Sequence, residues 1–134
     1  MNLRIPGPTP CPPEVLTASA QQMINHRGPE FQALLKRVEA GLKTVYATNG
    51  DMLILTTAGT GAMESAVVNM LSPGDKVLVV SIGVFGDRFA TIAETYGAQV
   101  TRLKYELGLA ADPDEVAKAF ASDGSYKALL ITHN

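Results

Sequence analysis

A turn of small residues between an apolar run and a helical pattern is the stretch of this sequence best suited to chemistry. Residues 52–55 are apolar, residues 56–61 read Thr-Thr-Ala-Gly-Thr-Gly, and a helical pattern follows from residue 62 to 71. The first backbone N–H groups of a helix have no partner within it, and the helix dipole adds positive potential there. Glycines allow an anion to approach closely, and Thr57 and Thr60 can add hydroxyl donors. The pattern predicts a buried strand, a turn and a helix that together bind a phosphate group.

Two common phosphate-binding motifs do not fit this turn. A P-loop ends in Gly-Lys-Ser/Thr, but no lysine occurs between Gly50 and Lys76. A dinucleotide fingerprint needs glycine or alanine where this chain has Glu64, and an acid after the next strand, where residues 77–83 have none. NAD is therefore disfavoured. A tight strand-to-helix turn that binds no ligand is the alternative.

An aromatic residue between two glycines follows the next apolar run. Phe85 lies between Gly83 and Gly86, and its ring could stack on a flat ligand. The alternative is that Phe85 fills the core beneath its loop. His26-Arg27 and His133 are further candidates for acid, base or anion contacts, although such residues are more often structural.

Composition limits the classes of protein to be considered. The chain has 134 residues, 46% of them hydrophobic and 18% charged, with a net charge of -2, which is typical of one globular domain and gives no reason to expect nucleic acid or a membrane as partner. The single Cys11 excludes an internal disulfide and a cysteine-based metal cluster. Without an apolar span or a signal-peptide pattern, we expect a cytoplasmic location.

The elements that must position these residues alternate in type. Residues 1–13 are rich in proline and predict a stiff N-terminal arm, followed by helices from Pro13 and from Pro29 to about Ala47. Apolar strands at 52–55, 76–81, 99–105 and 127–132 alternate with three helices. This order predicts an α/β fold, a parallel sheet built of βαβ units with helices on both faces.

Ligands of such sheets bind at the carboxyl ends of the strands, where residues 57–61, 83–86 and 132–134 are expected to meet. The last strand stops without a polar tail, and natural domains seldom end in this way. We therefore expect residues 14–134 to be an incomplete domain whose C-terminal remainder is absent.

Several motifs occur together in one order along the chain. They are Pro6-Gly7-Pro8-Thr9, His26-Arg27-Gly28-Pro29-Glu30-Phe31, Ala58-Gly59-Thr60-Gly61 with Glu64, Ser72-Pro73-Gly74-Asp75-Lys76-Val77, Gly83-Val84-Phe85-Gly86-Asp87-Arg88 and Thr132-His133-Asn134. This set resembles class V aminotransferases, which depend on pyridoxal phosphate and have fold type I. It is most similar to the alanine–glyoxylate and serine–glyoxylate aminotransferases, some of which are labelled as a soluble hydrogenase subunit. The resemblance covers only about the first third of such an enzyme.

The resemblance implies a cofactor, pyridoxal 5'-phosphate, and a set of residues that contact it. Ala58, Gly59 and Thr60 correspond to the turn that binds the phosphate group, and Phe85 to an aromatic that stacks on the pyridine ring. Gly7 lies where the N-terminal arm passes the substrate. The family's activity implies amino transfer from alanine or serine to glyoxylate or pyruvate, in a homodimer.

One departure from the family affects activity. The Schiff-base lysine of the relatives lies downstream of the segment that this chain covers, and none of its own lysines matches that motif. We therefore expect no catalytic residue in this chain, and no activity from the chain alone. Two other readings stay open: a nucleotide-binding α/β domain without aminotransferase chemistry, and a non-catalytic fragment that self-associates.

Overall fold

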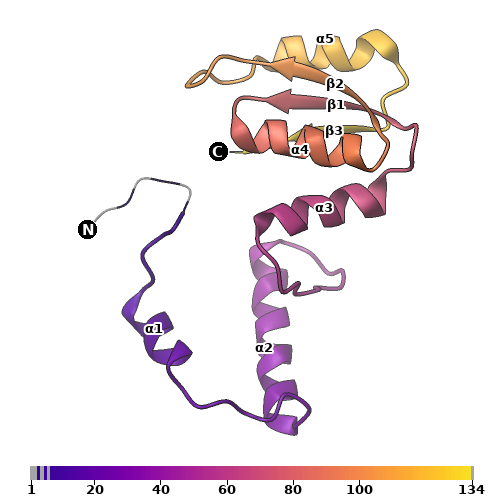
Figure 1. The fold of residues 1–134 in the computed structure, drawn as a ribbon. Helices are drawn as coiled ribbons and strands as arrows, with labels where there is room; N and C mark the ends of the chain where they lie inside the picture. The colour runs from indigo at the N-terminus through magenta and orange to yellow at the C-terminus, as the bar shows by residue number, and fades with distance from the viewer. Residues whose placement is uncertain (1–2, 4, 6, 134) are drawn as a thin grey trace. The chain divides into compact units, whose positions relative to one another are not determined.

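The computed structural model describes residues 3, 5 and 7–133, which form two compact units that divide between Ile54 and Leu55. The first unit contains two helices, α1 (Pro13–Ser19) and α2 (Pro29–Val45) (Figure 1). Each begins with a proline, which fixes a helical φ at the one position where a missing N–H costs nothing. Both predicted helices are confirmed.

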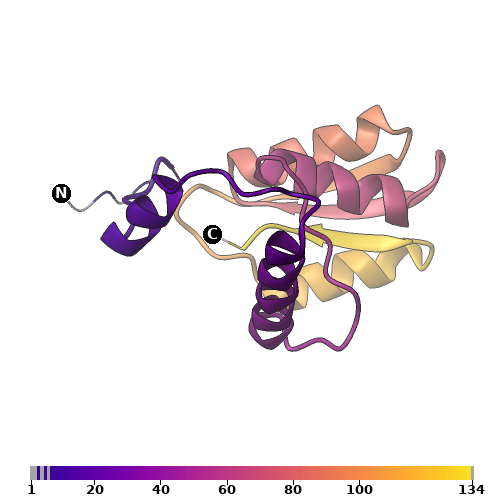
Figure 2. The same ribbon diagram turned by 90° about the horizontal axis from the view of Figure 1, so that it is seen from below.

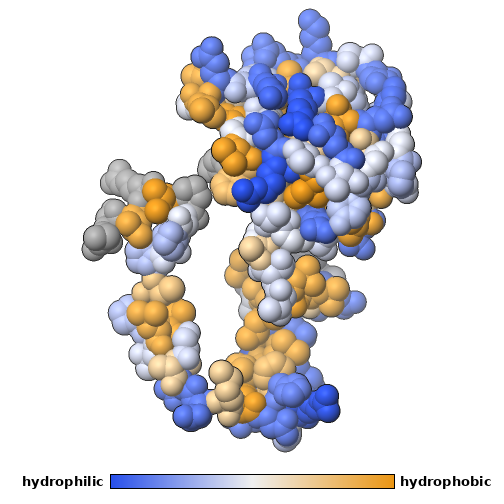
Figure 3. Space-filling view, in the orientation of Figure 1, coloured by the Kyte–Doolittle hydropathy of each residue, from blue (hydrophilic) through white to orange (hydrophobic). Residues whose placement is uncertain are grey.

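The apolar residues of the first unit are largely exposed. Helix α1 ends at Ser19 and contains no buried residue, and Met23 beyond it is 93% exposed. No residue of α2 is buried, although Leu34 and Val38 lie one turn apart and form part of an apolar stripe along one side of the helix. Figure 3 shows apolar surface along the part of the molecule where α2 runs. Within the first unit, no other element buries this stripe.

The second unit contains a parallel sheet with helices on both faces. Strands β1 (Lys76–Ser81), β2 (Gln99–Lys104) and β3 (Ala128–Ile131) lie in the order β2-β1-β3, and β1 pairs in parallel with both neighbours. Helix α4 (Val84–Thr95) covers one face and α5 (Pro113–Asp123) the other (Figures 1 and 2), while α3 (Gly59–Met70) packs on α4. The predicted α/β fold class is confirmed.

The core is built around the central strand. Val77, Leu78, Val79 and Val80 of β1 are each at most 1% exposed. A strand that pairs along both edges and is covered on both faces has no polar side, so its sequence reads as a continuous apolar run. Val67 of α3 and the small residues of α4 complete this core.

The prediction of a strand at residues 52–55 is wrong. Residues 51–55 form no strand, and Leu53 and Ile54 are 83% and 55% exposed. A strand is held by the backbone hydrogen bonds of a neighbour, and the described sheet consists of β2, β1 and β3 without this segment. The phosphate-site candidate is therefore preceded by irregular chain.

Helix α4 begins at Val84, directly after Gly83, so Phe85 lies in the first turn of a helix and not in a loop. In the part of the chain that the structure describes, no helix combines the length and the apolar character needed to cross a bilayer.

Candidate functional site

The predicted phosphate turn forms the first turn of α3. Ala58 is the N-cap, with extended dihedrals (φ -81°, ψ 171°), and its carbonyl accepts hydrogen bonds from the N–H groups of Gly61 and Ala62 at 3.0 and 3.4 Å. The N–H groups of Gly59 and Thr60 precede these and have no carbonyl one turn back within the helix. Two backbone donors therefore lie at an exposed helix start.

The charge at this helix start is not balanced by the chain's own acids. Four of the described helices carry an acid in their first turn: Glu14 in α1, Glu30 in α2, Asp87 in α4, and Asp114 with Glu115 in α5. Among the described helices, α3 is the exception, and no side chain caps it. An external anion would supply the negative charge that helix starts favour.

The two glycines of this turn differ in their surroundings. A Cβ added to Gly61 would lie 2.0 Å from Oγ1 of Thr57, because this side chain lies against the first turn of α3. A Cβ added to Gly59 would meet nothing within 4 Å. Gly61 thus serves the packing of the turn, whereas Gly59 leaves open space at the free N–H groups. These features fit a phosphate group.

Phe85 is the second residue of α4, and its side chain is only partly buried, at 37% exposure. The helix is held against the end of β1 by close backbone packing. A Cβ on Gly86 would lie 2.7 Å from Cα of Ser81, a distance that no real Cβ tolerates. Glycine at position 86 therefore lets the first turn of α4 lie on the sheet, and this places the Phe85 ring at the carboxyl end of β1.

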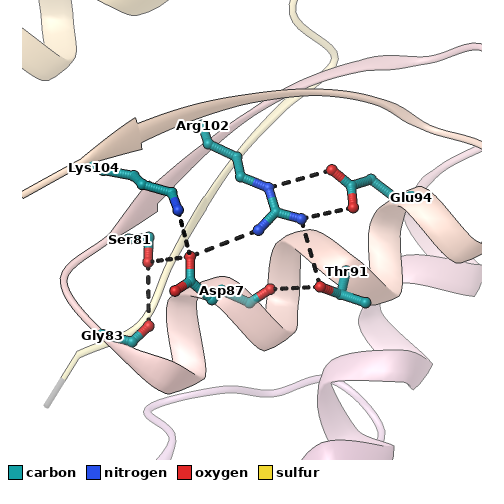
Figure 4. Close-up of polar contacts among 7 residues, drawn as sticks. All are labelled: Ser81, Gly83, Asp87, Thr91, Glu94, Arg102 and Lys104. Carbon is teal, nitrogen blue, oxygen red and sulfur yellow. Dashed lines mark hydrogen bonds and ion pairs between the residues drawn. The ribbon is translucent and has the colours of Figure 1, made fainter.

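A set of polar contacts fixes the segment between β1 and α4 (Figure 4). The buried hydroxyl of Ser81 lies 3.0 Å from Oδ1 of Asp87 and 3.2 Å from the carbonyl oxygen of Gly83, and it donates to one of these acceptors at a time. Arg102 and Lys104 of β2 approach the same carboxylate oxygen at 3.7 and 3.8 Å. The segment that carries Phe85 is thus tied to two strands.

Arg88 brings the two predicted cofactor contacts together. Its Nη1 donates a hydrogen bond to Oγ1 of Thr60 at 2.9 Å, and its Cζ lies 5.3 Å from the centroid of the Phe85 ring. Sequence reasoning assigned no role to Arg88, although it is three residues after Phe85 and three-residue spacing places side chains on one face of a helix. That spacing is the signal that could have found it.

A second contact joins α3 to α4 one turn further along. The hydroxyl of Tyr96 donates a hydrogen bond to Oε1 of Glu64. This bond, together with partial desolvation and the nearby negative charge, raises the pKa of Tyr96 above its usual value of 10.0. The two helices that carry Thr60 and Phe85 are therefore joined by two polar contacts.

The third predicted segment follows β3 beside the end of β1, since Val80 pairs with Ile131. A cleft of about 560 Å³ at the carboxyl ends of the strands is lined by Ile82, Ile131, Thr132, His133 and residues 108–111. Within the described chain, the Thr132 hydroxyl is buried without a hydrogen-bond partner, and His133 is exposed. Thr60 and Phe85 do not line this cleft, and Asn134 lies outside the described residues. The three segments thus meet only in part.

The remaining candidates belong to the first unit. Gly7 is exposed, and a Cβ added to it would meet nothing within 4 Å, so its predicted contact with the substrate stays a prediction. His26 is also exposed, and Cys11 is an exposed free thiol.

Comparison with known proteins supplies relatives for the whole chain, although no family model matches it. The chain is 41% identical to the "Soluble hydrogenase 42 kDa subunit" of Anabaena cylindrica, over 100% of its own length and 36% of the relative's. It is 34% identical to the serine–glyoxylate aminotransferase of Methylorubrum extorquens, over 99% and 34% of the two lengths. A solved structure, the alanine–glyoxylate aminotransferase of Nostoc sp., matches 87% of this chain and 31% of its own, with a TM-score of 0.80 and 32% identity.

These matches agree in sequence and in fold. The structural neighbours are fold type I pyridoxal-phosphate transferases, and the sheet and helices of the second unit match part of that fold. The sequence and structure neighbours that cover the chain are alanine/serine–glyoxylate-type aminotransferases, to which it is similar over its whole length. It spans about a third of the length of the curated relatives it matches.

Proposed function

We propose that the whole protein is a class V aminotransferase of small amino acids that depends on pyridoxal 5'-phosphate. Alanine or serine is the proposed amino donor, and glyoxylate or pyruvate the acceptor. The observation that carries this proposal is the pairing of an uncapped helix start at Thr60 with an aromatic ring at Phe85 through one arginine. A ligand that joins a phosphate group to a flat ring needs both contacts, whereas a simple anion needs only the helix start.

The residues of this chain would bind and orient the cofactor. Gly59 and Thr60 would donate backbone N–H groups to its phosphate, with the Thr60 hydroxyl as a further donor and Ala58 shaping the turn. Phe85 would stack on the pyridine ring, and Gly7 would contact the substrate. When bound, pyridoxal phosphate supplies the electron sink for chemistry at the α-carbon of an amino acid.

The residue that moves the proton at that carbon is proposed to lie outside these 134 residues. Of the lysines in this chain, Lys76 is paired with Asp123 at 3.0 Å, and Lys104 lies near Asp87. Each of these two lysines therefore takes part in an ion pair within the fold. We infer that the chain alone is inactive, with residues 1–13 acting as an arm and residues 14–134 as part of the cofactor domain.

We further infer a homodimer in the cytoplasm. The apolar stripe of α2, which the first unit does not bury, supports self-association, because exposed apolar surface marks interaction sites. The net charge of -2 gives no electrostatic reason to expect a membrane or a nucleic acid as partner.

The test is a titration of the protein, purified from its own gene, with pyridoxal phosphate. We expect an absorbance band near ~420 nm that borohydride abolishes where a catalytic lysine is present, and transfer of the amino group from alanine or serine to glyoxylate. An intact mass of 14.2 kDa with bound cofactor but no reducible band would mean an inactive chain.

Two variants connect this test to the site. Phe85→Leu and Thr60→Val are expected to weaken cofactor binding while the melting temperature of the free protein is unchanged. Thermal protection by NAD or ATP, without protection by pyridoxal phosphate, would instead favour a nucleotide-binding domain. No binding of any of these ligands would contradict the proposal and favour a non-catalytic, self-associating protein.

A further inference from the structure

We propose that Arg88 is a positioning residue for the cofactor, which prepares the Thr60 hydroxyl as a phosphate donor and holds the Phe85 ring. This inference rests on the proposed function, because it assigns Arg88 to the same site. It requires no direct contact between Arg88 and the cofactor.

The hydrogen bond to Thr60 determines what its hydroxyl can do. Nη1 of Arg88 donates to Oγ1 of Thr60 at 2.9 Å, and a guanidinium has no acceptor to take the hydroxyl proton in return. The Thr60 O–H therefore stays available to another acceptor. A cationic donor also polarises the hydroxyl and makes it a stronger donor. An anion at the start of α3 is an acceptor in the right place.

The same guanidinium restrains the Phe85 ring. Its Cζ lies 5.3 Å from the ring centroid, within the range of a cation–π contact. Phe85 is 37% exposed, so other packing restrains the ring incompletely. Because an aromatic ring has two faces, a guanidinium on one face leaves the other for a flat ligand.

Among the described residues, Arg88 forms no ion pair with an acidic side chain. The ion pairs of α4 and β2 join Arg102 to Glu94 at 2.6 Å, and join Arg102 and Lys104 to Asp87. None of the ion pairs found among the described residues includes Arg88. Its charge therefore remains at the start of α3. A lysine could not replace Arg88 fully. The planar guanidinium of arginine can donate a hydrogen bond and stack on a ring at the same time, whereas the ammonium of lysine is a point charge.

The experiment compares cofactor binding by Arg88→Met, Arg88→Lys and a control, Lys118→Met, which removes an exposed cation from α5. Each is titrated with pyridoxal phosphate and with pyridoxal, which lacks the phosphate, and the circular dichroism of the bound cofactor is recorded. We expect Arg88→Met to weaken binding of the phosphate form about tenfold, the scale of one charged hydrogen bond, and binding of pyridoxal about threefold. Arg88→Lys should restore less than half of the loss, and Lys118→Met should match the wild type.

A double-mutant cycle with Thr60→Val separates positioning from a general structural effect. If Arg88 acts on the phosphate through Thr60, then Arg88→Met in the Thr60→Val background should cost only the roughly threefold loss seen with pyridoxal. An undiminished tenfold loss in that background, or wild-type binding by Arg88→Met, would overturn this inference alone. A wild-type protein that binds no pyridoxal phosphate would overturn the proposed function, and the inference with it.

Discussion

The buried hydroxyl of Ser81, the last residue of β1, lies 3.0 Å from Oδ1 of Asp87 in the first turn of α4. This contact joins the carboxyl end of the central strand to the helix that carries both Phe85 and Arg88. The Asp87 carboxylate also offsets the positive potential at the start of α4. The start of α3 has no acid in its first turn, so its positive potential is not offset in this way. The two helix starts are therefore in different electrostatic states, although they lie in one unit.

Replacing Asp87 with alanine should reduce the stability of the second unit. The variant loses a hydrogen bond to Ser81 and a favourable charge at the helix start, together about 1–2 kcal/mol. Asp87→Asn keeps an acceptor and should cost less than half as much. Urea unfolding measures both, with the exposed Glu106→Ala as the control expected to match the wild type. Equal losses in Asp87→Ala and Asp87→Asn would contradict a role for the hydrogen bond.

Gly86→Ala should be more damaging than its small change in size suggests. Its Cβ would lie 2.7 Å from Cα of Ser81, so the first turn of α4 must move away from the sheet, at about 1–3 kcal/mol. Gly83→Ala is the matched control, because its Cβ would make an ordinary contact 3.5 Å from Leu107. Thermal unfolding of the two variants tests this, and a control as unstable as Gly86→Ala would contradict the packing explanation.

Gly59→Ala should separate binding from stability. Its Cβ meets nothing within 4 Å in the protein but occupies the open space beside the free N–H groups of α3. We expect an unchanged melting temperature and about tenfold weaker binding of pyridoxal phosphate, corresponding to one lost charged hydrogen bond. Gly61→Ala should instead lower the melting temperature, since Oγ1 of Thr57 lies 2.0 Å from the new Cβ. Unaltered affinity in Gly59→Ala would place the phosphate elsewhere.

The contact between Tyr96 and Glu64 should make stability fall at alkaline pH. The folded protein holds the Tyr96 proton more tightly than the unfolded chain, because the hydrogen bond to Glu64 raises its pKa above 10.0. The stabilising contribution is thus fully present below about pH 10 and is lost as pH rises through the higher, folded pKa.

Urea unfolding of the wild type and of Tyr96→Phe across this range provides the measurement. The variant should be less stable than the wild type at neutral pH, and the difference should disappear in alkali. Tyr46→Phe, which removes an exposed hydroxyl from the first unit, should keep the wild-type pH profile. A difference between Tyr96→Phe and the wild type that is independent of pH would contradict the assignment.

The sequence by itself determined the architecture of the second unit and the chemical character of its site. Residues 77–80 form a continuous apolar run, which is typical of a strand buried on both faces, and they form the central strand of the parallel sheet. The glycines and threonines of residues 57–61 were sufficient to predict a helix start at this point of the chain, because helix starts and turns depend on local residue types, although α3 begins at Gly59 and not at the predicted residue 62.

Only the tertiary structure decided which predicted elements found partners. Residues 52–55 are as apolar as a strand, yet they form none, because a strand depends on hydrogen bonds from another segment. The contact between Arg88 and Thr60 spans 28 residues of sequence, and an exposed arginine carries no local pattern that names its distant acceptor. The local pattern of apolar residues encodes the tendency of a segment to be buried. Which strands pair, and which distant side chains come into contact, depends on where the rest of the chain lies.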